Sequence, residues 1–168
     1  MSKIASCLWF KDEAEEAVSL YVSLLPNSRI DYIQRNVEDS IGGKEGTVLV
    51  IEFTLAGQRF QALNGGVKFE HSYAVSFSID CADQAEVDRL WDRLLEDGGK
   101  EEQCGWLKDR YGMSWQIVPS VLPKMIADPD KEKARRVFRA MLQMVKIDVA
   151  ALKRAYEGRD EGSRSAAE

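Results

Sequence analysis

Two stretches of the chain place apolar residues with the period of an amphipathic helix. Residues 12–25 (DEAEEAVSLYVSLL) and 83–96 (DQAEVDRLWDRLLE) both begin Asp-x-Ala-Glu, after which apolar residues recur every three or four positions. The pattern predicts helices with Asp12 and Asp83 as N-caps, each followed three residues later by the glutamate of a capping box. Pro26 ends the first helix, because proline cannot continue it, and Asp-Gly-Gly ends the second.

A short run with strand character precedes each predicted helix. Residues 72–80 alternate apolar and polar positions as a half-buried strand does, and residues 4–10 occupy the same place in the first half. Three further strand-like runs follow each helix. They are 29–37, 47–55 and 59–64 after the first helix, and 100–104, 105–109 and 113–119 after the second.

The last strand of each half repeats one pattern. GQRFQAL (57–63) and GMSWQIV (112–118) both hold a glycine, two residues, an aromatic residue, a glutamine and two apolar residues. Such an internal repeat indicates two copies of one supersecondary unit that share a core. The predicted fold class is α+β, with a βαβββ module over 1–66 and a second over 67–120, together one structural domain.

The chain after the second module is mostly helical in pattern. From 121 to 158 we expect a helical extension whose apolar stripe buries against its own sheet or a partner subunit. The stripe consists of Ala134, Val137, Phe138, Met141, Leu142 and Val145. Residues 159–168 are polar and are expected to form a disordered tail.

Composition and charge exclude several classes of protein. The net charge of −5 gives no attraction to nucleic acid or to an anionic membrane. No run approaches the ~18 apolar residues of a membrane span. Three cysteines without CxxC spacing are typical of reduced thiols rather than of a disulfide framework. An acidic helix so close to the first residue leaves no room for a signal peptide, so we expect a cytoplasmic protein.

Four strings of the sequence carry a resemblance to a known family: AEEAVSLYVSLLPNS, FTLAGQRFQALNGG, SFSIDCADQAEVDRLWDRL and QCGWLKDRYGMSWQIVP. Together they resemble the PhnB-like group of the vicinal oxygen chelate superfamily, whose domain is often labelled 3-demethylubiquinone-9 3-methyltransferase. The superfamily contains glyoxalases, extradiol dioxygenases and fosfomycin-resistance proteins. The resemblance covers residues 1–120, and 139–152 is similar to the group's C-terminal helices. It implies curved mixed sheets (the vicinal oxygen chelate fold), with the helix on the convex side and the active site on the concave side.

The resemblance also implies where a metal would bind. In the superfamily a divalent metal is typically held by the first and last strands of each module, and the last-strand ligand is usually Glu or, in some members, Gln. Here Gln61 and Gln116 occupy that place. The first-strand positions, usually His, fall at Ala5 (or Ser6) and at Ala74.

These residues make a poor metal site. Sliding the alignment offers only Cys7 and Ser76, and the single histidine, His71, stands just before the second module's first strand. Two neutral amides bring no charge to offset a dication, whose unneutralised burial costs on the order of tens of kcal/mol in a low-dielectric limit. No cofactor is therefore expected, and a metal, if present, would use Gln61, Gln116 and His71.

Strand alternation places both glutamines toward the concave side, with Phe60 and Trp115 toward the helix side. Without a metal, the glutamines either orient a polar ligand or hydrogen-bond each other or backbone across the module interface. Trp9 belongs to the same side by strand parity, and Trp106 is expected at its rim. The alternative is that these two rings fill a cavity that no ligand uses. The candidate ligand-binding residues are Trp9, Gln61, Trp106 and Gln116.

The leading functional prediction is a small-molecule-binding protein of the glyoxalase/bleomycin-resistance type that works without a metal. The alternatives are a metal-dependent lyase, isomerase or dioxygenase of the same superfamily, and a non-catalytic dimeric scaffold. Superfamily members commonly dimerise, so a homodimer is expected. No cofactor motif supports the methyltransferase label, because neither GxGxxG nor GxxxxGK[ST] lies between a strand and a helix. The sequence leaves open whether any reaction is catalysed.

Overall fold

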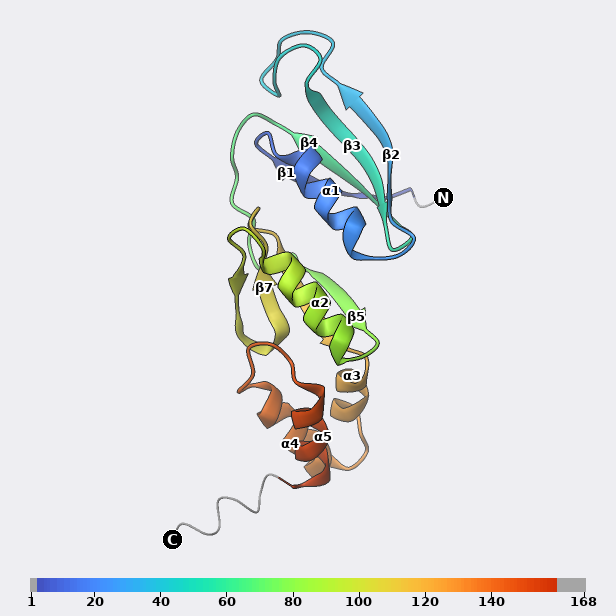
Figure 1. The fold of residues 1–168 in the computed structure, drawn as a ribbon, viewed down its shortest axis with the longest axis vertical. Coiled ribbons are helices and arrows are strands. Elements are labelled where there is room, and N and C mark those ends of the chain that lie inside the picture. Colours follow the sequence, from blue (N-terminus) through green and yellow to red (C-terminus); the bar gives the residue numbers. More distant parts are fainter. Residues whose placement is uncertain (1–2, 160–168) are drawn as a thin grey trace. The chain divides into compact units, whose positions relative to one another are not determined.

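The computed structural model describes residues 3–159, which divide into two compact units, one up to Glu70 and one from His71 onward. Each unit contains a helix packed on one face of a four-stranded mixed sheet (Figure 1). Three further helices follow in the second unit. The predicted α+β class, with two βαβββ modules and C-terminal helices, is confirmed.

The first unit holds one sheet and one helix. Its elements are β1 (Ser6–Phe10), α1 (Ala14–Leu24), β2 (Arg29–Arg35), β3 (Val48–Leu55) and β4 (Gln58–Asn64). The strand order is β1-β4-β3-β2, with β1 parallel to β4 and the other neighbours antiparallel. A hairpin joins β3 to β4: Ala56 and Gly57 both have positive φ, as a two-residue type I′ turn requires.

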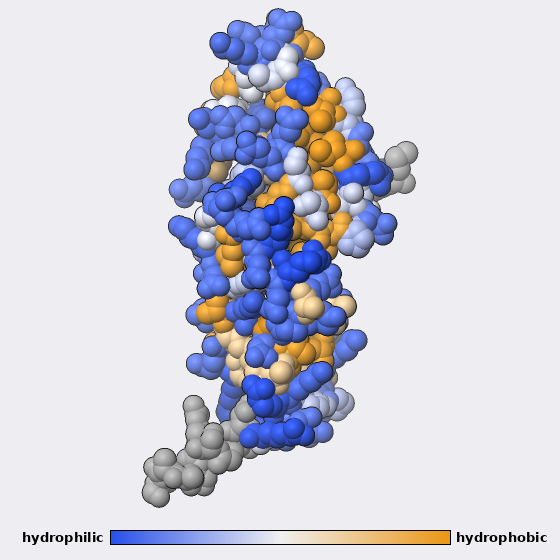
Figure 2. Space-filling model, viewed as in Figure 1, coloured by the Kyte–Doolittle hydropathy of each residue, from blue (hydrophilic) through white to orange (hydrophobic). Residues whose placement is uncertain are grey.

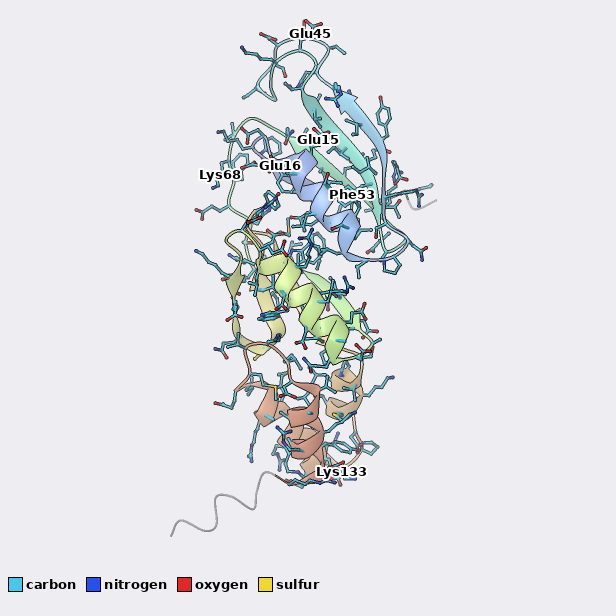
Figure 3. The ribbon with its side chains drawn as sticks, in the orientation of Figure 1. Glu15, Glu16, Glu45, Phe53, Lys68 and Lys133 are labelled. Atoms are coloured by element: carbon cyan, nitrogen blue, oxygen red, sulfur yellow. The ribbon has the colours of Figure 1, made fainter. Side chains whose placement is uncertain are left out.

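The core of the first unit lies between α1 and the sheet. Phe53 of β3 and Phe60 of β4 stack with ring centroids 5.4 Å apart, and both are buried. Glu15 and Glu16 lie on the outer side of α1, as Figure 3 shows. Buried residues of α1 complete the core: Ala14, Ala17, Val18, Tyr21 and Leu24. Their spacing of three and four is the predicted helical period.

The helix leaves part of this sheet uncovered. Ile30 and Ile33 of β2, the edge strand, are only half-buried. Figure 2 shows hydrophobic side chains at the surface between α1 and this edge.

The predicted N-cap of the first helix is wrong. Asp12 does not cap α1; the backbone N–H of Ala14 instead donates to Asn64 Oδ1 over 2.9 Å. The neighbouring Glu13 turns its carboxylate back to accept from the backbone N–H groups of Lys11 and Asp12, at 3.1 and 3.0 Å. A side chain distant in sequence therefore satisfies a donor at the helix start that the local pattern assigned to Asp12.

The second unit repeats the arrangement. Its elements up to the last strand are β5 (Phe77–Cys81), α2 (Gln84–Leu95), β6 (Lys100–Glu101), the 3₁₀ turn η1 (Gln103–Gly105), β7 (Trp106–Lys108) and β8 (Ser114–Pro119). The strand order is β5-β8-β7-β6, with β5 parallel to β8. Here the predicted N-cap is confirmed, because Glu86 N–H donates to Asp83 Oδ1; the Glu86 carboxylate in turn accepts from Ala82 N–H, one residue before the N-cap.

Two strand predictions in this unit are too long. The run 72–80 becomes a strand only at Phe77, because the Ser72 hydroxyl and carbonyl oxygens accept from Ala74 N–H and Val75 N–H and close a turn. The run 100–104 ends as a strand at Glu101, and the 3₁₀ turn follows.

The extension folds into helices α3 (Val121–Ile126), α4 (Lys131–Met141) and α5 (Val149–Glu157), of which α4 and α5 pack together (Figure 1). They enclose a small core of Leu122, Val137, Ile147 and Leu152. The predicted stripe needs correction: α4 ends before Leu142 and Val145, and Phe138 and Leu142 are 45% and 46% exposed. Burial against a partner subunit, and the homodimer it implies, stay predictions.

The link between α4 and α5 is tied to α2. Gln84 Nε2 donates to the Ile147 carbonyl at 3.1 Å, and Gln84 Oε1 accepts from Val149 N–H at 2.8 Å. Lys146 Nζ lies 2.9 Å from Asp88 Oδ1, one turn further along α2. The extension is therefore anchored to the second module by side chains of α2.

Among residues 3–159, every helix is too short or too polar to span a lipid bilayer. The expected tail, 159–168, lies outside the described residues except for Arg159.

Candidate functional site

In each unit the face of the sheet turned away from the helix carries the predicted glutamine. Gln61 on β4 has Cys7 of β1 and Glu52 of β3 as its strand partners, and all three side chains share that face. The neighbouring Phe60 and the equivalent Trp115 are 5% and 0% exposed, on the helix side of their sheets. The predicted orientation of both aromatics is confirmed.

Glu52 is a residue that the sequence reasoning missed. Gln61 Nε2 donates to Glu52 Oε1 at 3.3 Å, and Arg59 lies 3.1 Å from the other oxygen of the same carboxylate. Alternation along β3 gives the signal that could have found it, because Glu52 lies between the buried Ile51 and Phe53 and must face the other way. The glutamine of the first module is thus part of a chain of three polar side chains.

Trp9 lies on the predicted face of the sheet, because its strand partner Leu63 is two residues from Gln61 on β4 and therefore shares its face. Its indole N–H donates to the Val67 carbonyl at 2.7 Å, and its ring meets Phe69 edge-on at 5.3 Å. A Cβ placed on Gly65 would lie 1.9 Å from this ring, so only glycine permits the backbone to pass there. The segment after β4 therefore packs on Trp9 and satisfies its N–H.

In the second unit Gln116 Nε2 donates to Ser76 Oγ at 2.8 Å. Strand registers show which residues are equivalent in the two modules: Ser6 pairs with Phe60, and Phe77 pairs with Trp115. The residue equivalent to Ala5 is therefore Ser76, one residue before Phe77. The alignment to Ala74 is corrected, and the slid alignment that offered Ser76 agrees with the strand registers.

Trp106 and Gln116 are strand partners on β7 and β8, so their side chains share the face away from α2. Beside Trp106 lies a pocket of about 720 Å³. Its lining residues are Tyr73, Glu101, Glu102, Gln103, Trp106 and Val145.

Polar contacts fix the position of Tyr73 in this lining. The Tyr73 hydroxyl donates to Glu102 Oε1, which raises the pKa of the phenol because that hydrogen bond favours the protonated form. Lys108 Nζ lies over the Tyr73 ring, 3.9 Å from its centroid. The phenol is thus held between a carboxylate at its hydroxyl and an ammonium on its face.

One wall of the pocket comes from the extension. The backbone N–H groups of Cys104 and Gly105 donate to the carbonyls of Met144 and Val145, both at 2.8 Å. A Cβ on Gly105 would lie 2.9 Å from the Ile147 side chain and from the Ile117 carbonyl, so this approach requires glycine. These contacts set Val145 against the module where Trp106 begins β7.

The four tryptophans differ in how their indole N–H groups are used. Trp9 donates to the Val67 carbonyl, Trp91 to Glu101 Oε1 at 3.0 Å, and Trp115 to Asp109 Oδ2 at 2.9 Å. Within the described part of the chain, the half-buried Trp106 has no such acceptor. Its donor is open to a ligand or to water.

The predicted ligand-binding residues thus form two pairs, Trp9 with Gln61 on the first sheet and Trp106 with Gln116 on the second. That all four border one cup stays a prediction. His71 lies in the segment before β5, outside both sheets.

The residues present do not fit a divalent metal. Residues 3–159 contain no group of three or more His, Cys, Asp or Glu side chains placed to hold one. Gln61 and Gln116 use their amide N–H groups on Glu52 and Ser76, and the one carboxylate among these partners is already paired with Arg59. Hard cations need more carboxylate charge than this arrangement supplies.

The strand-to-helix turns also do not fit S-adenosylmethionine in the Rossmann manner. Each sheet has one parallel pair, β1–β4 or β5–β8, rather than an alternating parallel sheet. The turns that lead into α1 and α2 hold Glu13 and Asp83 instead of glycines, and side chains of the protein, Asn64 and Asp83, already accept from N–H groups at the two helix starts.

These features define a two-module α+β protein with a paired glutamine on the open face of each sheet. The family model described as 3-demethylubiquinone-9 3-methyltransferase matches residues 2–118, and the chain belongs to this family.

One solved structure agrees with this assignment, and a second shares the fold. A PhnB protein from Bacillus cereus shares 35% identity over 70% of this chain and 99% of its own, with a TM-score of 0.63. Protein PA1353 from Pseudomonas aeruginosa shares 19% identity over 71% of this chain and 98% of its own, with a TM-score of 0.58. The comparison with curated proteins gives no match. The family match ends at residue 118, so the helices that bring Val145 to the pocket lie beyond it.

Proposed function

We propose that this protein binds a small molecule in the pocket beside Trp106, without a bound metal ion. The single observation that carries the proposal is the indole N–H of Trp106. This N–H has no acceptor within residues 3–159, although the other three tryptophans all have one, and Trp106 is a lining residue of a pocket of about 720 Å³.

The chemistry of the lining supports this function. Ligand sites for small molecules are commonly clefts of about 300–1,000 Å³ with aromatic walls and a few polar groups that fix orientation. Trp106 and Val145 provide apolar surface, and the side chain of Gln103 offers an amide. These groups can hold and orient a ligand, and none of them forms a recognisable nucleophile–base pair, so we propose binding rather than catalysis.

The experiment is a ligand screen by NMR on ¹⁵N-labelled protein. Each of the four tryptophans gives an indole N–H signal, so one spectrum reports on each ring separately. We expect ligands that bind to move the Trp106 signal, with Trp106→Phe weakening them and the matched variant Trp9→Phe leaving them unchanged. Ligands that bind equally well to Trp106→Phe would contradict the proposal.

A further inference from the structure

We infer that the ligand of this pocket is a small organic cation with an aromatic or apolar body, an inference that rests on the function proposed above. Among the described residues, the lining of the pocket includes two carboxylates and an indole, and no lysine, arginine or histidine. Charge and ring chemistry together therefore select for a positive group.

The first carboxylate, Glu102, stands directly beside the indole. Its backbone N–H donates to the Trp106 carbonyl at 2.9 Å, which continues the antiparallel register from the Glu101–Leu107 pair. Residues paired in this way point to the same face of a sheet, so the carboxylate of Glu102 and the ring of Trp106 share one side. A cation on the ring would thus meet a negative charge at its edge.

The second carboxylate, Glu101, belongs to the other side of the strand and is fixed there. Its Oε1 accepts from Trp91 Nε1 at 3.0 Å. This hydrogen bond fixes the side chain but does not neutralise the carboxylate, because the indole donor is uncharged. The pocket therefore keeps two negative charges, of which only Glu102 adjoins Trp106.

Two lysines near the pocket do not cancel this charge. Lys146, next to the lining residue Val145, lies 2.9 Å from Asp88 and 3.9 Å from Asp92, and both carboxylates act on it more strongly than Glu101 does. Lys108 lies on the face of Tyr73. Among the described residues, neither these two lysines nor Lys100, which precedes Glu101 in β6, belongs to the lining of the pocket.

The position of Lys108 also shows that this lining accepts an ammonium group. Its nitrogen is 3.9 Å from the centroid of the Tyr73 ring, a cation–π geometry within the usual limit of about 6 Å. Tryptophan is a stronger partner for a cation than tyrosine is. Trp106 offers such a ring in the same pocket, and Val145 provides apolar surface for the rest of the ligand.

The test compares three probes of one size that differ in charge: 2-phenylethylamine, 2-phenylethanol and phenylacetate. Titrations of the full chain follow the Trp106 indole N–H signal. We expect 2-phenylethylamine to bind about tenfold more tightly than the alcohol, from combined cation–π and carboxylate attraction. Phenylacetate is expected to bind least tightly, and added salt to weaken the amine alone.

Two variants locate the effect. Glu102→Gln is expected to remove the preference for the amine over the alcohol, measured as the ratio of the two affinities within the variant. Glu96→Gln removes one negative charge from an exposed position that does not line the pocket, and it should preserve the preference. Unchanged indole signals of Trp9, Trp91 and Trp115 without ligand show that Glu102→Gln is folded.

The outcomes separate this inference from the proposed function. If the alcohol or phenylacetate moves the Trp106 signal with equal or higher affinity than the amine, the cation inference is overturned and the binding function stands. If none of the three probes moves that signal, the cation inference is also overturned, and the wider ligand screen decides the function. An amine preference that survives in Glu102→Gln overturns the assigned role of that carboxylate.

Discussion

Asn64 at the end of β4 caps the helix that begins fifty residues earlier, since its Oδ1 accepts from the backbone N–H of Ala14 at 2.9 Å. The same side chain donates from Nδ2 to the Val48 carbonyl at 3.0 Å, and Asn64 is only 5% exposed. One buried amide thus joins the helix start, the last strand and the beginning of β3 in the first unit.

The first prediction is that Asn64→Ala strongly destabilises the protein. The substitution leaves the Ala14 donor and the Val48 acceptor without their partner in a buried site, and each such group costs about 1–3 kcal/mol. We expect the free energy of unfolding to fall by about 2–4 kcal/mol, measured from urea denaturation followed by circular dichroism.

Two aspartates provide the matched comparison for this prediction. Asp83→Ala removes a true N-cap and should cost about 1 kcal/mol. Asp12→Ala, at the same place in the repeat, removes no cap and should change stability by less than about 0.5 kcal/mol. An equal loss of stability in Asp83→Ala and Asp12→Ala would contradict the assignment of Asp83, and not Asp12, as an N-cap.

The second prediction concerns Asp109, which is buried at the turn before β8. Its Oδ2 accepts from Trp115 Nε1 at 2.9 Å, and its Oδ1 accepts from the backbone N–H groups of Tyr111 and Met113. In Asp109→Asn an NH₂ donor replaces one oxygen, so a donor faces a donor whichever way the amide is turned. We expect a loss of about 2 kcal/mol in unfolding free energy.

Asp97→Asn is the control for this substitution. Asp97 pairs with Arg110 at 2.6 Å, but its side chain is 71% exposed, so the loss should stay below about 0.5 kcal/mol. Thermal unfolding of both variants under one condition measures the difference. A smaller effect of Asp109→Asn than of Asp97→Asn would refute the role given to the buried carboxylate.

Much of the fold could be predicted from periodicity, because helix and strand periods reflect which face is buried. Periodicity gave a wrong prediction where a turn or a tertiary contact competed with the local pattern. The alternation around Val75 continued the strand pattern, but Val75 is 65% exposed and lies in a turn closed by Ser72. The Asp-x-Ala-Glu string is the same in both modules. The first helix is nevertheless capped differently, because the side chain of Asn64 accepts from its first N–H group.

The site was predicted in part for similar reasons. Alternation fixed the face of Gln61 and Gln116, since that depends only on position within a strand. Their partners depend on neighbouring strands: alternation along β3 gives the face of Glu52, but its contact with Gln61 depends on the pairing of β3 with β4. Val145 could not have been found at all, because the packing of the extension against η1 brings it to Trp106.

The third prediction is that the protein does not bind divalent metals through its glutamines. Gln61 and Gln116 already donate to Glu52 and Ser76, and Arg59 compensates the one carboxylate. Calorimetric titration of metal-stripped protein with Mn²⁺, Ni²⁺, Co²⁺ and Zn²⁺ should show no sub-micromolar binding, and Gln116→Ala should give the same result. Tight binding that Gln116→Ala abolishes would favour the metal-dependent enzyme instead.

The fourth prediction uses pH to test how the extension is anchored. Lys146 lowers the pKa of Asp88 through their hydrogen bond, and Asp88 raises the pKa of Lys146 in return. The contribution of the carboxylate is present above its unfolded pKa, near pH 4, and is lost as pH falls through the lower folded value. The contribution of the ammonium is present below its unfolded pKa, about 10.4, and is lost as pH rises through the higher folded value. The pair therefore stabilises the protein across the neutral range.

Asp88→Asn isolates this pair. It should reduce the loss of stability between pH 7 and pH 3, measured as the shift of the urea midpoint, because the charge that is protonated in acid is already absent. Both side chains are partly exposed, so solvent screening keeps the difference below about 1 kcal/mol. The control is Asp92→Asn, because Asp92 lies 3.9 Å from the same lysine and is 74% exposed, and it should leave the pH dependence almost unchanged. If Asp88→Asn shows the same acid dependence as the native chain, this ion pair does not help to hold the extension, and the contacts of Gln84 remain as the anchor on α2.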